Sequence, residues 1–131
     1  MYKCNLSTCG LQAIPNYFKF SEFIITSVKV SNYPLDSDSL SNLSRLWYIL
    51  NRIRHCFGAP IYINSAFRTP SVNSAVGGVP NSYHLQGRAA DICTLPHLMD
   101  DFRQFLNDIK EQHPNLFVEF IDKGTFFHIA I

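Results

Sequence analysis

Residues 82–91 read SYHLQGRAAD, a stretch in which a histidine loop leads into a strand that carries a carboxylate. Asp91 stands among small and apolar residues, where an unpaired carboxylate costs several kcal/mol or gives up its charge. A hydrogen-bond network, a basic partner or a metal should compensate it. His84 lies on the loop before the strand, and Gly87 allows the chain to fold back. A histidine and a carboxylate supply two of the three protein ligands of a catalytic zinc site, but a plain His–Asp hydrogen bond explains the pair equally well.

The strand predicted at 88–93 leaves space beside this carboxylate. Side chains alternate between the two faces of a strand, so Asp91 shares its face with Ala89 and Cys93. These neighbours are small, and another group can therefore approach Asp91 on that face.

Two β-like runs close the chain, LFVEFID at 116–122 and TFFHIAI at 125–131. In the second run Phe126, His128 and Ala130 should share one face. An isolated histidine in so apolar a strand is more often a satisfied core residue than a ligand, and both roles stay open for His128 on this pattern alone.

The turn between these runs brings a second ionisable residue towards His128. If Lys123 and Gly124 form a two-residue loop after Asp122, counting back sets Glu119 directly opposite His128. The pair would then be a ligand with an acid/base group, or a ligand with the partner that orients it. A bulge at Gly124 would slip the register by one residue.

The other elements follow from periodicity and from turn residues. The predicted set is a lead-in segment at 15–23 anchored by phenylalanines, a short strand at 24–30, a core helix from Ser39 to Phe57 capped by Ser37 or Asp38 and closed by Gly58, a strand at 60–67, a short helix at 70–76 and an amphipathic helix at 97–112. Helices and strands in this mixture, with a terminal hairpin, predict an α+β fold with an antiparallel sheet flanked by helices. Without repeats or linkers, we expect one domain over 1–131, with 1–16 as an N-terminal extension.

The composition excludes several classes of partner. The 131 residues carry a net charge of +1, with 47% hydrophobic and 16% charged residues, and the basic residues form no run or stripe. Nucleic acid and anionic membrane surfaces are therefore not expected as partners. No apolar run approaches a membrane span, and the N-terminus has no signal-peptide pattern. We expect synthesis in the cytoplasm and action elsewhere only after release.

The cysteines at 4, 9, 56 and 93 form no Cys-x-x-Cys pair, which argues against a zinc ribbon. Cys56 and Cys93 are predicted to be buried thiols. Cys4 and Cys9 receive no role.

Arg68 follows the predicted strand at 60–67, at the end where a site would open. A guanidinium there can hold a carboxylate through two hydrogen bonds. A lone arginine is more often a solvated surface residue.

The segment SAFRTPSVNSAVGGVPNSYHLQGRAADI, with the late histidine, resembles the zinc peptidases that include D-alanyl-D-alanine carboxypeptidases and L-alanyl-D-glutamate endopeptidases, and among them the small phage-type members. Their motif reads S-x-x-R-x-x-x-x-N-x-x-x-G-G, then S-x-H-x-x-G-x-A-x-D, then a histidine near the end. The matching positions are Ser65, Arg68, Asn73, Gly77, Gly78, Ser82, His84, Gly87, Ala89, Asp91 and His128. The likeness covers residues 17–131.

The resemblance implies a D-alanyl-D-alanine peptidase and Hedgehog-like zinc fold. It implies a Zn²⁺ ion held by His84, Asp91 and His128, with a water as fourth ligand, and hydrolysis of a peptide bond in the stem peptides of bacterial peptidoglycan. Arg68 would bind a substrate carboxylate or carbonyl, and Ser82 would line the site.

Ser65, the first residue of the motif, is likewise implied to contact substrate. The chain departs from the family pattern at the catalytic acid, which several members place three residues before the last histidine. That position is Thr125 here, and a hydroxyl cannot serve. Glu119 is the first candidate for the general base, on hairpin geometry, and Asp122 is the second.

Three functions remain open from the sequence. The leading hypothesis is a monomeric, phage-encoded zinc peptidase of the endolysin or carboxypeptidase type that acts on the cell wall. The second is a catalytically silent zinc-binding module of the same fold. The third is a structural phage protein with a hydrogen-bonded His–Asp–His cluster and no metal. The sequence does not decide between carboxypeptidase and endopeptidase.

Overall fold

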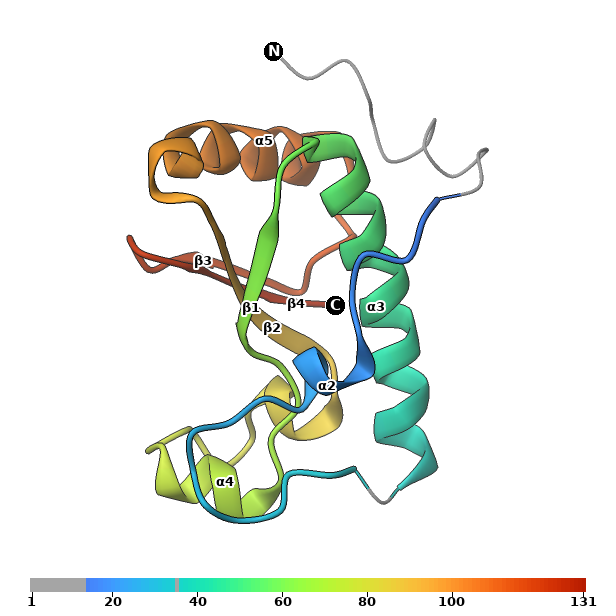
Figure 1. Ribbon diagram of the computed structural model, residues 1–131, viewed down its shortest axis with the longest axis vertical. Coiled ribbons are helices and arrows are strands. Elements are labelled where there is room, and N and C mark those ends of the chain that lie inside the picture. The colour runs from blue at the N-terminus through green and yellow to red at the C-terminus, as the bar shows by residue number, and fades with distance from the viewer. Residues whose placement is uncertain (1–13, 35) are drawn as a thin grey trace.

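A computed structural model describes residues 14–34 and 36–131 (Figure 1). Its elements run in the order α2 (Phe20–Phe23), α3 (Ser37–Phe57), β1 (Ile61–Ser65), α4 (Pro70–Ala75), η1 (Tyr83–Gln86), β2 (Ala89–Thr94), η2 (Pro96–Leu98), α5 (Met99–Gln112), β3 (Glu119–Asp122) and β4 (Phe127–Ala130). The predicted α+β class is confirmed.

The sheet places the two predicted ligand strands side by side. Its order is β1-β2-β4-β3, and every neighbouring pair is antiparallel. In the central pair, Asp91 of β2 stands directly opposite His128 of β4. Residues 37 positions apart in the chain thus meet in the middle of the sheet.

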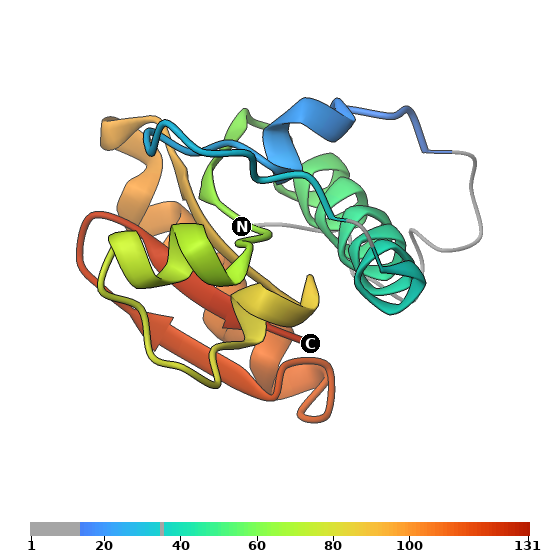
Figure 2. The ribbon, with the colours of Figure 1, turned by 90° about the horizontal axis from the view of Figure 1, so that it is seen from below.

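One face of this sheet forms the hydrophobic core. Ile92, Phe127 and Ile129 are fully buried there, together with the apolar stripes of α3 and α5. In Figure 1, α3 runs along one side of the sheet and α5 lies at one end of the molecule, with α4 at the end opposite α5; Figure 2 shows α3 beside the sheet from below. Because alternate residues point to opposite faces, Asp91 and His128 project from the face away from this core.

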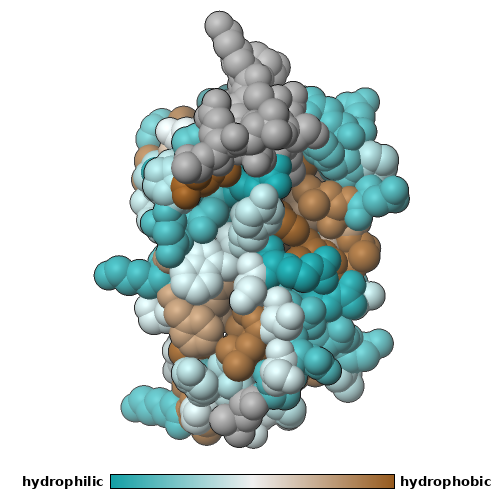
Figure 3. Space-filling view, turned by 90° about the vertical axis from the view of Figure 1, so that its right-hand side faces the viewer, coloured by the Kyte–Doolittle hydropathy of each residue, from teal (hydrophilic) through white to brown (hydrophobic). Residues whose placement is uncertain are grey.

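Helix α3 begins at Ser37, which is earlier than a cap at Ser37 or Asp38 would allow. The Asp36 carboxylate accepts a hydrogen bond from the Ser39 backbone N–H (2.9 Å), so Asp36 is the N-cap and the prediction of Ser37 or Asp38 is wrong. The helix ends at Gly58, as predicted. Its outer face mixes hydrophilic and apolar side chains (Figure 3). Among the described residues, neither this helix nor another combines the length and apolarity that crossing a membrane requires.

The predicted strand at 24–30 is wrong, because the segment pairs with no strand of the sheet. Its Ile25 and Val30 side chains are about half exposed, at 49% and 47%. Hydrogen bonds of the Asn32 side chain, just after the segment, hold its end in place instead. The buried Asn32 amide donates to the carbonyls of Ile24 and Phe67, and its oxygen accepts from the backbone N–H of Thr69.

The hairpin exists, but its predicted register is wrong by two residues. Asp122 pairs with Phe127, so the loop is 123–126 rather than two residues long. The Asp122 carboxylate accepts from the Gly124 N–H, and Lys123 N–H donates to the Phe126 carbonyl, which closes this wider turn. A slip of two keeps every side chain on its predicted face.

The cysteine prediction holds only in part. Cys56 is disulfide-bonded, so the prediction of a free thiol at this position is wrong. Cys93 is free, lies half-buried on β2, and burial raises the pKa of its thiol. Cys4 and Cys9 lie outside the described residues.

We expect Gly87→Ala to destabilise the fold by roughly 2 kcal/mol or more. Gly87 has φ +71°, and a Cβ there would lie 2.7 Å from the Ser39 carbonyl oxygen and 3.0 Å from Leu43 Cγ. The added methyl would push η1 away from α3. Urea unfolding measures the change, and Gly58→Ala, whose Cβ would meet no atom within 4 Å, is the control for φ alone. Equal losses in both variants would contradict the packing argument.

Candidate metal centre

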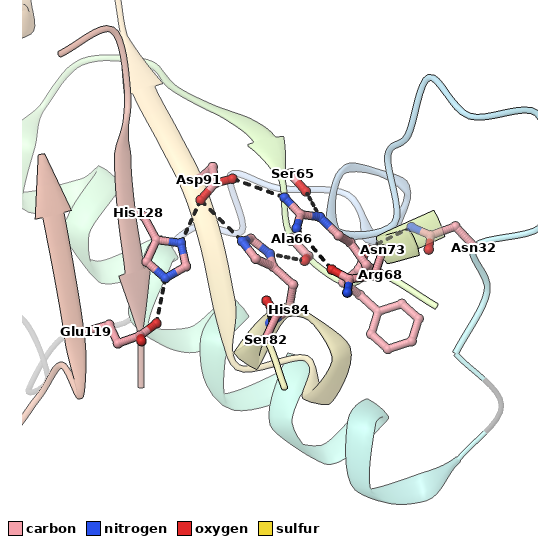
Figure 4. A network of polar contacts seen from close by, with 11 residues as sticks. Asn32, Ser65, Ala66, Arg68, Asn73, Ser82, His84, Asp91, Glu119 and His128 are labelled. Carbon is pink, nitrogen blue, oxygen red and sulfur yellow. Dashed lines mark hydrogen bonds and ion pairs between the residues drawn. The ribbon is translucent and has the colours of Figure 1, made fainter. Parts of the chain in front are cut away.

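Three side chains from three segments converge on one point (Figure 4). The Oδ1 atom of Asp91 lies 2.9 Å from Nδ1 of His128 and 3.3 Å from Nε2 of His84. One potential ligand atom from each residue lies within 4.8 Å of the other two. The structure therefore brings together the whole predicted ligand set.

The tautomer of His84 is fixed by the backbone. Its Nδ1–H donates to the Ala66 carbonyl at 2.6 Å, because a carbonyl can only accept. The Nε2 lone pair is then directed at the space beside Asp91. This is the usual arrangement of a histidine that binds a metal through one nitrogen and is oriented through the other.

The surroundings of the centre favour the charged forms of Asp91 and of His128. Burial disfavours the Asp91 carboxylate, but the adjoining imidazoles of His128 and His84 outweigh it and hold the pKa of Asp91 well below its ordinary value. The hydrogen bond with Asp91 raises the pKa of His128, against burial, and Glu119 acts in the same direction. A buried negative charge between two imidazoles attracts a cation.

Glu119 contacts the outer nitrogen of His128, at 2.8 Å between Oε1 and Nε2. The two residues are diagonal neighbours, since Ile121 and not Glu119 stands directly opposite His128. The predicted hairpin register was wrong, but the predicted contact between Glu119 and His128 is present. Glu119 and Ile121 lie on the same face of β3, so Glu119 can still reach His128. The Glu119 side chain is 40% exposed, so it also faces solvent.

Arg68 lies on the other side of Asp91, as Figure 4 shows. Its Nη2 is 3.6 Å from Asp91 Oδ2, and its Nε donates to Ser65 Oγ at 3.2 Å. Ser65 reaches this place through an irregularity in β1 that pairs it with Asp91. The Arg68 side chain is only 17% exposed, so it is a fixed cation of the site rather than a solvated surface residue.

Asn73 holds this arginine, a role that sequence reasoning did not assign. Its Oδ1 accepts from Arg68 Nη1 at 3.3 Å, while its Nδ2 donates to the Val79 carbonyl. A Cβ on Gly78 would overlap the Asn73 side-chain oxygen and lie 3.0 Å from Arg68 Nη1. The spacing of Asn73 and the glycine pair 77–78 is visible in the sequence. The contact of Asn73 with Arg68, however, cannot be deduced from that spacing.

The structure does not bring Asp122 to the centre. Asp122 points to the opposite face of the sheet, where its carboxylate accepts from Arg103 Nε at 2.6 Å. Thr125 is exposed in the hairpin loop. Glu119 is thus the carboxylate nearest the ligands in the described part of the chain, and the second candidate for the base is misplaced.

A cleft of about 580 Å³ opens beside the ligands. One wall is the segment 79–86, including Ser82, whose hydroxyl accepts from the His84 backbone N–H. The other wall is the hairpin, with Glu119 and His128 at its base. A volume of this size suits a short peptide or a small molecule.

The three residues fit a zinc ion. Two imidazole nitrogens and one carboxylate oxygen are the donors of many catalytic zinc sites, which keep one further position open. The donors are nearly buried, their outer atoms are hydrogen-bonded to Ala66 and Glu119, and the cleft gives access from solvent. The fold and this ligand set are those of a zinc metallopeptidase.

Comparison with known protein families supports this class, because the sequence model of the family described as Peptidase M15 matches residues 16–130. The chain belongs to this family. It is also similar to the zinc D-Ala-D-Ala carboxypeptidase of Streptomyces albus G, with 48% identity over 44 residues. That match covers 33% of this chain and 17% of the relative.

Proposed function

We propose that the protein hydrolyses a peptide bond in the stem peptides of bacterial peptidoglycan. The observation that carries the proposal is the His84–Asp91–His128 set beside a peptide-sized cleft, which His128 and Glu119 line. The similarity to a carboxypeptidase named for D-Ala-D-Ala supports the choice of substrate.

The zinc ion, when bound, would polarise the scissile carbonyl and acidify the attacking water. Glu119 takes up the proton of this water and passes it to the leaving amine, because it is a half-exposed carboxylate within the cleft. Arg68 holds a carbonyl or carboxylate of the substrate on the far side of Asp91, fixed by Ser65 and Asn73.

The reaction would take place at the cell wall, since the substrate is found there. All three ligands, Glu119 and Arg68 come from one chain, so a monomer suffices. A phage-encoded lytic enzyme and a D,D-carboxypeptidase are both compatible with this site.

Digestion of purified muropeptides, followed by mass spectrometry, tests the proposal. We expect one new amine terminus per cleaved peptide, at one type of bond, and no cleavage after zinc is removed with a chelator. Intact muropeptides in the presence of zinc would contradict the proposal and favour a silent zinc-binding module.

A further inference from the structure

The cleft on the His128 side has one cationic wall residue that the reaction does not use. Lys123 lines it together with Glu119 and Ile121, and is the only lysine or arginine among the described residues that form the cleft. Positions 119, 121 and 123 alternate with Phe120 and Asp122, which face the core side. Lys123, the residue after the end of β3, therefore continues its cleft-facing row.

The backbone under Lys123 is held in place. Arg103 binds the Asp122 carboxylate at 2.6 Å and the Gly124 carbonyl at 3.2 Å, on either side of this lysine. The nearest acid in sequence, Asp122, is thus neutralised on the other face. The Lys123 ammonium makes no ion pair with any residue of the described chain, which leaves it free to meet an anion.

Two exposed apolar side chains line the same cleft as this cation and His128. Val79 on one wall is 61% exposed and Ile121 on the other is 43% exposed. Ile121 stands directly opposite His128 in the sheet. Exposed branched side chains on facing walls of a cleft suit a small aliphatic group, such as an alanine methyl.

We propose that Lys123 determines specificity by binding a free carboxylate of the peptide substrate, with Val79 and Ile121 contacting the aliphatic side chain between that carboxylate and the scissile bond. This inference rests on the proposed function. It adds a second anchor in the cleft that His128 lines and Arg68 does not. Stem peptides offer such carboxylates on D-glutamate, on a diamino acid and at the C-terminus, and the shared chemistry is the carboxylate.

Matched muropeptides test it, each pair carrying either a free carboxylate or a carboxamide at one of these positions. We expect the wild type to prefer the carboxylate form in one pair about tenfold in kcat/KM, mainly through KM. Lys123→Met keeps the aliphatic length but removes the charge, and should abolish this preference by lowering kcat/KM for the carboxylate form towards that for the amidated form. The pair that responds identifies the source of the carboxylate.

Lys110→Met is the control, since Lys110 lies over the Phe120 ring on the core side. The inference is wrong if the wild type cleaves both members of every pair equally, or if Lys123→Met retains the preference. Both results would leave the proposed function standing. A wild type that cleaves no muropeptide would instead overturn the proposed function and this inference with it.

Discussion

Glu119→Gln is expected to lower kcat by about 10²- to 10⁴-fold while zinc content stays unchanged. A glutamine oxygen can still accept the hydrogen bond from His128 Nε2, which Glu119 accepts at 2.8 Å. An amide cannot take up a proton, however. The substitution therefore separates the two roles open to Glu119, which are moving a proton and orienting a ligand. Steady-state kinetics and metal analysis of the same preparation measure both.

Asp122→Asn is the matched control for this variant. It removes a carboxylate from the same strand, but on the face where Asp122 binds Arg103. Its activity should remain close to that of the wild type. If Glu119→Gln kept more than about half of the wild-type kcat, Glu119 would only orient His128, and the base would have to be another group.

His84→Ala is expected to reduce bound zinc from about one ion per chain to less than a tenth, and activity by about 10³-fold or more. His84 supplies Nε2 to the centre, with its other nitrogen held by Ala66. Elemental analysis after gel filtration measures the loss. Zinc should also raise the Tm of the wild type and leave that of the variant unchanged, because only the native wild type binds the ion.

Asp91→Asn is a second ligand variant that separates loss of zinc from loss of folding. Asparagine keeps the shape of a side chain that contacts both histidines and Arg68. It should fold and still lose most of its zinc. His97→Ala, at an exposed position on η2, should keep full zinc content. Retention of zinc by both ligand variants would mean that the ion, where present, binds elsewhere.

The ligand set is implied by the resemblance to zinc peptidases, and strand alternation accounts for two of its three members. Asp91 and His128 each stand out in an apolar strand, and β2 and β4 place them directly opposite. Glu119 reaches His128 although the predicted register is wrong. A hairpin slip of two residues preserves the face, and a diagonal neighbour is within reach of a long side chain.

Features that depend on tertiary contacts could not be predicted. The β-branched run at 24–30 has strand composition, but Asn32 ties its end to the backbone at Phe67 and Thr69 instead of leaving it to join the sheet. The role of Asn73 likewise requires knowing that Arg68 folds back over it. Burial of polar groups in such networks leaves no periodic signal in a sequence.

Anomalous X-ray diffraction at the zinc absorption edge, on crystals grown with zinc, tests the central claim most directly. The account predicts a single strong peak within bonding distance of His84 Nε2, an Asp91 carboxylate oxygen and a His128 ring nitrogen. No peak among these three side chains, or a peak on other residues alone, would contradict it.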